Sequence, residues 1–205
     1  MKRIMIYPGA FNPFHPHHRY GMEYFGRIYE MSNGILIPSY NHPEKNDIKN
    51  FDNRVKIIET FLEEMPLSFP VEVSQDEKIT GSTGRSIINE CELREGDKYL
   101  FLGIDTVLEK LEQMEDYKKI LGLATLMVND YDGEITKIKG YPNETCIDTK
   151  SGGITLPMKK DRIIFDKNPF SGLHSTAIRN DPEKYLYLFP EKTRKLVEKY
   201  YVKRD

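Results

Sequence analysis

Residues 8–18 read PGAFNPFHPHH and directly follow a short apolar run at residues 4–7. The apolar run predicts a buried strand, because it ends at Pro8 and Gly9, two residues typical of a turn or loop. Proline is favoured at the first position of a helix, so Pro16 predicts a helix that begins beside the histidines. The stretch therefore predicts a strand, a loop and a helix N-terminus in succession.

Strands and helices alternate along much of the remaining chain. Residues 16–31, 52–62 and about 83–94 carry apolar side chains at helical spacing, and helical segments are expected between 105 and 120. Asp52 is expected to cap the second helix. Short apolar runs at 34–38, 69–73, 99–102 and 123–128 predict strands. Such alternation predicts an α/β fold, with a parallel sheet covered by helices on both faces and a ligand site where the strands end.

The last third of the chain is less regular. Residues 130–160 contain scattered Gly, Pro, Lys and Asp without a sustained period. We therefore expect an insertion there, and a hairpin is one form that it could take. A last strand is predicted at 162–166, and the tail at 175–203 is predicted to be helical, interrupted at Pro182 and Pro190. A chain of 205 residues with 39% hydrophobic content favours one domain over residues 1–205.

Composition and charge exclude several classes of protein. The 30 basic and 32 acidic residues leave a formal charge of -2, which gives no general attraction for nucleic acid. Cys91 and Cys146 lack the spacing of a disulfide framework or a structural zinc site, so a reducing compartment is expected. The apolar run at residues 4–7 is too short for a signal peptide or a membrane span. We expect a cytoplasmic protein whose partners are small molecules, without nucleic acid or membrane.

His15 and His18 are three residues apart and would share one face of the first helical turn. Helix N-termini present free N–H groups and positive potential, and imidazoles add hydrogen-bond donors, so this pair suits a phosphate. The alternative is a metal pair extended by His17. A catalytic metal needs a third protein ligand that no nearby residue clearly supplies, so no metal ligand is predicted.

Ser175, Thr176 and Arg179 repeat this arrangement near the other end of the chain. Hydroxyls at a helix start can hold an anion, and Arg179 would project one turn further along. Ordinary helix capping explains the same residues when the segment is considered alone.

Residues 8–18 resemble the GGTFDPxHxGH segment of the HxGH nucleotidyltransferases, and residues 173–179 (LHSTAIR) resemble their ISSTxIR segment. The pair is far more specific than either member alone. Gly103 and Asp105 look like the G-x-D of this superfamily. Residues 116–121 and the tail at 185–201 are similar to bacterial nicotinate-nucleotide adenylyltransferases, so the resemblance covers most of the chain except the insertion. It implies a Rossmann-like nucleotidyltransferase fold with a helical C-terminal tail.

The resemblance implies an enzyme of NAD biosynthesis that moves AMP from ATP onto the phosphate of nicotinate or nicotinamide mononucleotide and releases pyrophosphate. By the same resemblance, His15, His18 and Arg179 are catalytic. ATP is expected to contact Gly9, Ala10, Phe11, Gly103, Asp105, Ser175 and Thr176. The acceptor is expected to contact Lys45, His42, Thr83 and Tyr117. Mg²⁺ would be bound mainly through phosphates and water, because magnesium retains several waters.

Several positions depart from the family pattern. His17 replaces the glycine of HxGH, and its side chain would either crowd ATP or add a phosphate donor. The chain has no tryptophan, and Met114 stands where the nicotinate enzymes usually carry one that stacks on the pyridine ring. The acceptor therefore stays open, with a phosphopantetheine adenylyltransferase or a catalytically lapsed nucleotide-binding module as the alternatives. Assembly into a homo-oligomer also stays open.

One arginine has two explanations. Arg54 resembles an arginine at the start of the family's second helix, and a surface or structural salt bridge would explain it as well.

Overall fold

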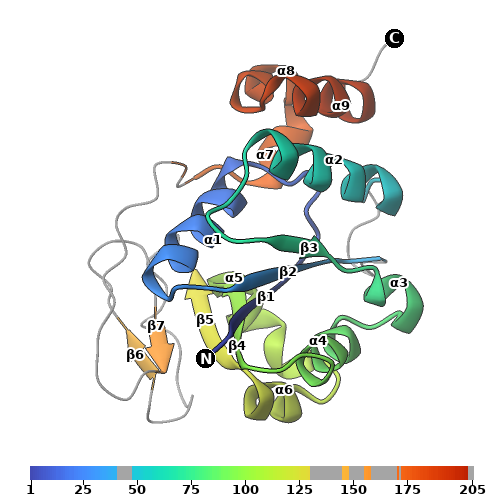
Figure 1. The fold of residues 1–205 in the computed structure, drawn as a ribbon. Coiled ribbons are helices and arrows are strands. Elements are labelled where there is room, and N and C mark those ends of the chain that lie inside the picture. The colour runs from blue at the N-terminus through green and yellow to red at the C-terminus, as the bar shows by residue number, and fades with distance from the viewer. Residues whose placement is uncertain (41–47, 130–144, 148–154, 158–169, 171, 203–205) are drawn as a thin grey trace.

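The computed structural model describes residues 1–40, 48–129, 145–147, 155–157, 170 and 172–202 (Figure 1). Its centre is a seven-stranded sheet with the order β3-β2-β1-β4-β5-β7-β6. The first five strands in this order run parallel to one another. They are β1 (Arg3–Gly9), β2 (Asn33–Pro38), β3 (Val71–Val73), β4 (Asp97–Gly103) and β5 (Thr125–Asn129). The predicted parallel α/β sheet is confirmed.

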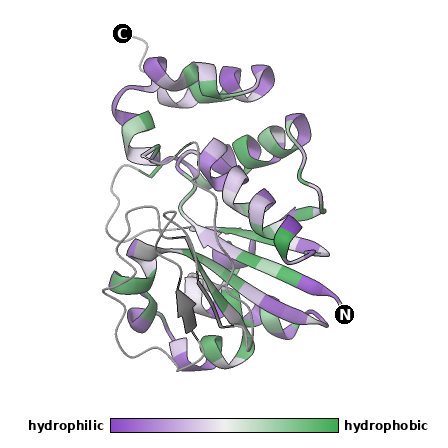
Figure 2. Ribbon diagram, turned by 90° about the vertical axis from the view of Figure 1, so that its left-hand side faces the viewer, coloured by the Kyte–Doolittle hydropathy of each residue, from purple (hydrophilic) through white to green (hydrophobic). Residues whose placement is uncertain are grey.

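Helices cover both faces of the sheet (Figure 1). On one face lie α1 (Pro16–Ile28) and α2 (Phe51–Glu64), with α9 (Glu191–Tyr201) packed on α2. On the other face lie α4 (Thr83–Glu92), α5 (Ile104–Glu109), η1 (Leu111–Gln113) and α6 (Tyr117–Leu123). Figure 2 shows hydrophobic colour concentrated on the strands between these two layers.

Side chains of each central strand divide between two cores, because successive residues of a strand point to opposite faces. Met5 and Tyr7 of β1 pack with the α1 and α2 side, whereas Ile4 and Ile6 pack with the α4 side. A strand that is buried on both faces reads as a continuous apolar run, which is how residues 4–7 read. The Rossmann-like fold follows from this pattern and is the one that the sequence predicted.

The predicted helix boundaries hold to within a few residues, with one wrong cap. Asn50, and not Asp52, caps α2: the Asn50 side chain accepts hydrogen bonds from the main-chain N–H groups of Asp52 and Asn53. Asp52 lies in the first turn and pairs with Lys78 at 3.0 Å. The short helix α3 (Asp76–Thr80) was not predicted, because its five residues are too few to show a period.

The predicted helical tail is confirmed, together with its interruptions. It consists of α7 (Ser175–Asn180), α8 (Pro182–Tyr185), η3 (Leu186–Leu188) and α9. Pro182 begins α8 and Pro190 is the N-cap of α9, positions where the missing N–H of proline costs nothing. Among the described residues, no helix is both long enough and apolar enough to cross a membrane.

Two short strands add to the far edge of the sheet. β6 (Thr145–Ile147) and β7 (Thr155–Pro157) pair antiparallel, and β7 also pairs antiparallel with β5. The remainder of the predicted insertion and the predicted strand at 162–166 lie outside the described residues. The assignment of residues 1–205 to one domain stays a prediction.

Candidate active site

A cavity of about 230 Å³ opens at the carboxyl ends of β1 and β4. The order β3-β2-β1-β4-β5 places β2 on one side of β1 and β4 on the other, so the chain changes direction between β1 and β4. Ligands of open α/β sheets bind at such a switch point. Both motifs singled out in the sequence contribute to its lining. The cavity is lined by residues 7–12, His15, His17, His18, Gly103, Asp105, Thr106 and residues 173–176 and 179.

The N-terminus of α1 arranges two of the histidines. His15 is the N-cap and Pro16 the first helical residue, as predicted. The main-chain N–H of His15 donates to Nδ1 of His18 over 3.2 Å, and the two ring centroids are 3.9 Å apart. A neutral imidazole whose Nδ1 accepts a hydrogen bond carries its proton on Nε2. Nε2 is therefore the donor that His18 can offer to a phosphate oxygen.

Aromatic packing fixes the ring of His18. Phe14 stacks on it and Phe11 meets it edge-on, each with ring centroids 5.3 Å away. The ring of Tyr7 also meets His18 edge-on, with the two ring centroids 6.1 Å apart. A side chain held on several sides presents its donor in one direction without further loss of rotamer freedom.

The C-terminal motif lies against the N-terminal loop. Ser175 donates through Oγ to the carbonyl of Pro13 over 3.1 Å. The guanidinium of Arg179 donates to the carbonyl of Asn12 over 2.9 Å and to Oγ1 of Thr176 over 3.2 Å. Residues separated by more than 160 positions in the chain thus form one wall of the cavity.

Four of the five histidines of the chain line this cavity: His15, His17, His18 and His174. Burial, followed by the charges of the other three imidazoles, lowers the pKa of His15 well below its ordinary value. His15 is therefore neutral near pH 7. A bound phosphate would add the negative charge that this cluster of imidazoles can accommodate.

Tyr7 of β1 and Asp105 at the start of α5 also line the cavity. Burial, and secondarily the charge of Asp105, raises the pKa of Tyr7, so its hydroxyl stays protonated. Among the described residues that line this cavity, Asp105 is the one with a carboxylate. Among the residues that the structure describes, no group of three or more His, Cys, Asp or Glu side chains is arranged to hold a metal ion.

Two predicted acceptor contacts, Thr83 and Tyr117, are not in the lining of the cavity. Each is the first residue of its helix, α4 or α6. The hydroxyl of Thr83 donates to Oε2 of Glu77 over 2.8 Å. The other two predicted acceptor contacts, His42 and Lys45, lie outside the described residues.

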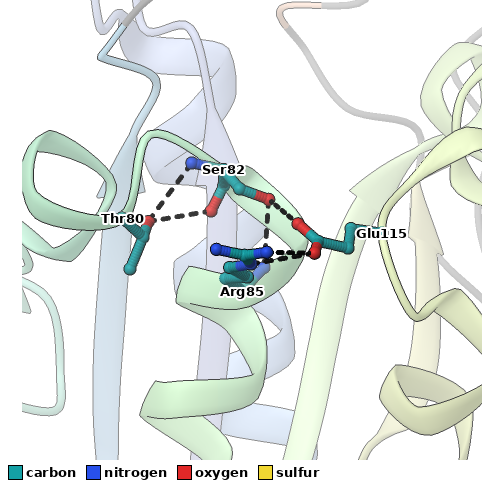
Figure 3. Close-up of polar contacts among 4 residues, drawn as sticks. All are labelled: Thr80, Ser82, Arg85 and Glu115. Atoms are coloured by element: carbon teal, nitrogen blue, oxygen red, sulfur yellow. Dashed lines mark hydrogen bonds and ion pairs between the residues drawn. The ribbon is translucent and has the colours of Figure 1, made fainter.

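The segments that carry Thr83 and Tyr117 are joined through Glu115, whose carboxylate points toward both Ser82 and Arg85 in Figure 3. Its carboxylate accepts from Oγ of Ser82 over 3.1 Å and pairs with the Arg85 guanidinium at 2.6 Å. The main chains also approach closely, because a Cβ on Gly84 would lie 2.5 Å from the carbonyl oxygen of Glu115. The N-termini of α4 and α6 are therefore held together.

Comparison with known proteins reveals similarity along the whole chain. A probable nicotinate-nucleotide adenylyltransferase of Fusobacterium nucleatum is 28% identical over 209 residues, covering 98% of this chain and 99% of the relative. One of Thermotoga maritima is also 28% identical and covers 97% of this chain and 92% of the relative. The chain is a distant, full-length homologue of these proteins. No model of a protein family matches it.

The fold has a counterpart among solved structures. Nicotinic acid mononucleotide adenylyltransferase of Plasmodium falciparum, complexed with APC, superposes with a TM-score of 0.69 at 14% identity. The match covers 98% of this chain and 97% of that one. At this identity the comparison supports the fold alone, and it agrees with the Rossmann-like architecture described above.

The structure locates three residues that depart from the family pattern: His17, Met114 and Asn12, which stands where the motif has aspartate. His17 is buried and is one of the residues that line the cavity. Met114 is half-buried and packs against the core under α4 and α6, as an ordinary apolar residue would. Oδ1 of Asn12 accepts from the hydroxyl of Tyr201 over 2.7 Å and from the main-chain N–H of Lys49 over 3.3 Å.

Sequence reasoning did not place Asn12, Thr106 or His174 in the site. His174 immediately precedes Ser175 and is the N-cap of α7, so its position beside the second motif was the available signal. Asn12 lies inside the first motif and Thr106 directly follows Asp105, so their positions beside predicted site residues were the available signal for both.

Proposed function

We propose that this protein transfers AMP from ATP to the phosphate of nicotinate mononucleotide or nicotinamide mononucleotide, releasing pyrophosphate in NAD biosynthesis. The observation that carries this proposal is the junction of the two motifs in one cavity. Four histidines and Arg179 surround the space at the switch point of the sheet. The full-length similarity to probable nicotinate-nucleotide adenylyltransferases supports the same activity.

The reaction needs no protein general base. The acceptor phosphate is already largely dianionic near neutral pH, because its second ionisation has a pKa of about 6. One of its oxygens attacks the α-phosphorus of ATP, the new phosphoanhydride bond forms, and the bond from the α-phosphorus to the bridging oxygen breaks. The electron pair of that bond leaves with pyrophosphate. Catalysis then rests on positioning and on charge neutralisation.

The side chains of the cavity suit these two tasks. His18, with its proton on Nε2, and neutral His15 would donate to oxygens that gain charge at the α-phosphate and the leaving group. Arg179, with Ser175 and Thr176, would hold the β and γ phosphates, since a guanidinium binds phosphate in a bidentate manner. Gly9, Ala10, Phe11 and Gly103 would contact ATP through the main chain.

Mg²⁺ would enter with the nucleotide. Its preferred ligands are oxygens, and it usually retains water and binds substrate phosphates with one or two carboxylates. Asp105, exposed at the cavity, is a carboxylate that fits this need. The ion would neutralise phosphate charge when bound. The cytoplasmic location and assembly into a homo-oligomer stay predictions.

The acceptor is tested by measuring pyrophosphate release from Mg-ATP with nicotinate mononucleotide, nicotinamide mononucleotide and phosphopantetheine in separate reactions. Release with either pyridine nucleotide is the expected result. Release with phosphopantetheine alone would assign the protein to that branch instead. ATP binding without release in any reaction would indicate a module that binds nucleotides but does not turn them over.

The His18→Ala variant tests the site itself. We expect it to keep the fold and to lose about 3 kcal/mol or more of transition-state stabilisation, roughly a 100-fold or greater loss of turnover. Turnover near the wild-type rate, measured on protein with an unchanged circular dichroism spectrum, would contradict the assignment of His18.

A further inference from the structure

Arg54 is a buried cation beneath the site that binds main-chain carbonyls. Its side chain is 0% exposed, so the surface reading of this residue is wrong. Nε donates to the carbonyl of Lys49 over 2.9 Å, Nη1 to the carbonyl of Ala10 over 2.5 Å, and Nη2 to the carbonyl of Ser39. The Lys49 carbonyl lies in the segment before α2, the Ala10 carbonyl in the loop after β1, and the Ser39 carbonyl directly after β2. One guanidinium therefore joins three segments at the carboxyl edge of the sheet.

The bond to Ala10 has a consequence for the cavity. The carbonyl of Ala10 and the N–H of Phe11 belong to one planar trans peptide group, in which they point in opposite directions. Arg54 holds the carbonyl from the protein interior. The N–H of Phe11 is therefore directed away from Arg54, and both residues of this peptide group line the cavity.

A second constraint acts on the same peptide. Phe11 has a φ of 44°, in the left-handed region that side chains other than glycine rarely adopt. Its ring is buried and meets the rings of Tyr7 and His18 with centroids 5.1 Å and 5.3 Å apart. The packed ring and the Arg54 hydrogen bond together fix a backbone conformation that the loop alone would not favour.

Arg54 also acts on the wall that Arg179 forms. The main-chain N–H of Lys49 donates to Oδ1 of Asn12, while the carbonyl of Asn12 accepts from Arg179. Arg54 holds Lys49 and Ala10 on either side of this connection. Loss of the guanidinium would release Lys49 and Ala10, two of the residues that fix the loop carrying Asn12.

We propose that Arg54 is a positioning residue for adenylyl transfer: it holds the Ala10 carbonyl from the interior and so presents the Phe11 N–H to the phosphates of the nucleotide. This inference rests on the proposed function of the cavity. A buried charge is costly unless its hydrogen bonds are made, and an apolar side chain of similar size would fill the same space without that cost. The need to position the loop explains why an arginine occupies this buried position, whereas the need to fill the core does not.

The test compares Arg54→Met with Ile58→Ala, a change one turn further along α2 at a core residue that is 0% exposed. Both variants lose stability, so kcat and KM for ATP are measured below the unfolding transition of each. We expect kcat/KM of Arg54→Met to fall by about 100-fold, because donors displaced by an ångström lose this much. The loss should lie mainly in kcat, since misplaced donors fail chiefly in the transition state. Ile58→Ala should keep the wild-type values.

A second readout follows the Phe11 amide directly. In ¹⁵N-labelled protein, Mg-ATP should shift the Phe11 amide resonance in the wild type and in Ile58→Ala, and leave it nearly unshifted in Arg54→Met. Arg54→Lys should fall between these limits, because an ammonium keeps the charge but lacks the planar fork that reaches three segments.

The outcomes separate the two proposals. An active wild type in which Arg54→Met matches Ile58→Ala, both in kcat/KM and in the response of the Phe11 amide, would overturn the role of Arg54. A wild type that releases no pyrophosphate with any acceptor would overturn the proposed function instead.

Discussion

His15 is the ionisable residue of the site whose protonation most clearly depends on folding. In the folded protein, burial and then the imidazoles of His18, His17 and His174 lower its pKa well below 6.5. In the unfolded chain the same imidazole titrates near its ordinary value. Below that value the unfolded state binds a proton that the folded state does not, so stability must fall as the pH falls.

The His15→Gln variant tests this coupling. The free energy of unfolding of the wild type should decline relative to the variant as the pH falls below about 6.5, by up to about 1.4 kcal/mol per pH unit. Urea unfolding of both proteins at several pH values between about 7.5 and 5.5 measures this difference in the free energy of unfolding. Parallel pH dependence in the two proteins would show that His15 has no lowered pKa.

Gly9 is a second residue whose surroundings allow a prediction. A Cβ at this position would lie 2.9 Å from two ring atoms of Phe11, which is 2% exposed and cannot move outward freely. Gly9→Ala should therefore cost about 1–3 kcal/mol of unfolding free energy through overpacking. It should also reduce kcat, because Phe11 belongs to the phosphate-facing loop.

Gly122→Ala provides the control for this substitution. Gly122 lies in α6, and a Cβ there would meet no heavy atom within 4 Å. Alanine in a helix is favoured over glycine by about 0.5–1 kcal/mol, so this variant should be as stable as the wild type or more so, with unchanged kcat. Equal thermal unfolding of the two variants would contradict the close contact at Gly9.

At the scale of the element, α7 depends on its tertiary contacts. Its six residues are too few to form a stable helix alone. Buried Ile178, the bond from Ser175 to Pro13 and the bond from Arg179 to Asn12 attach it to the N-terminal loop. The predicted helical tail was recognisable from the local pattern, whereas the junction of the two motifs was expected from family resemblance and not from any periodicity.

Arg179→Lys tests what this element contributes. An ammonium cannot reproduce a bidentate guanidinium contact, so KM for ATP should rise by about 10-fold, the effect of losing one hydrogen bond to a charged group. Arg194→Lys is a matched control, because the Arg194 guanidinium donates to the carbonyl of Phe189 and does not line the cavity. Initial rates at varied ATP concentrations give KM for both variants. If Arg179→Lys has the same KM for ATP as Arg194→Lys, Arg179 does not bind ATP.

At the scale of the whole molecule, the C-terminal helix reaches back to the first loop. Glu64 at the end of α2 accepts from the main-chain N–H groups of Lys192 and Thr193, each over 2.8 Å, and so fixes the start of α9. At the other end of α9, the hydroxyl of Tyr201 donates to Oδ1 of Asn12 over 2.7 Å. The last helix thereby supports the loop that forms the phosphate site.

Tyr201→Phe should loosen this support. Removal of one buried hydrogen bond should lower the free energy of unfolding by about 1 kcal/mol. A loss of about 1 kcal/mol in the binding of ATP would raise KM for ATP a few-fold. Tyr187→Phe is the control, because Tyr187 is 71% exposed. Thermal unfolding and ATP kinetics of the two variants give the comparison, and a Tyr201→Phe protein that behaves like the control would contradict a role of α9 in the site.

The sequence by itself determined the order and type of most elements and the start of α1 at Pro16, because apolar periodicity and proline preferences act within a few residues. Together with the family resemblance, it also singled out the histidine and arginine motifs. It could not place Thr83 and Tyr117 relative to the cavity. Only the tertiary structure revealed that Glu115 joins their helices and that the cavity lies elsewhere.

Only the tertiary structure, too, identified the residues that shape the phosphate loop. Arg54, Asn12 and Tyr201 act through partners up to 189 positions away, and the pKa of His15 falls because folding buries this side chain and, secondarily, surrounds it with imidazoles from both ends of the chain. Such contacts leave no local pattern, since a buried arginine that binds carbonyls reads in a sequence like any helical arginine. Their effect depends on which distant main-chain groups the folded chain brings within hydrogen-bonding distance.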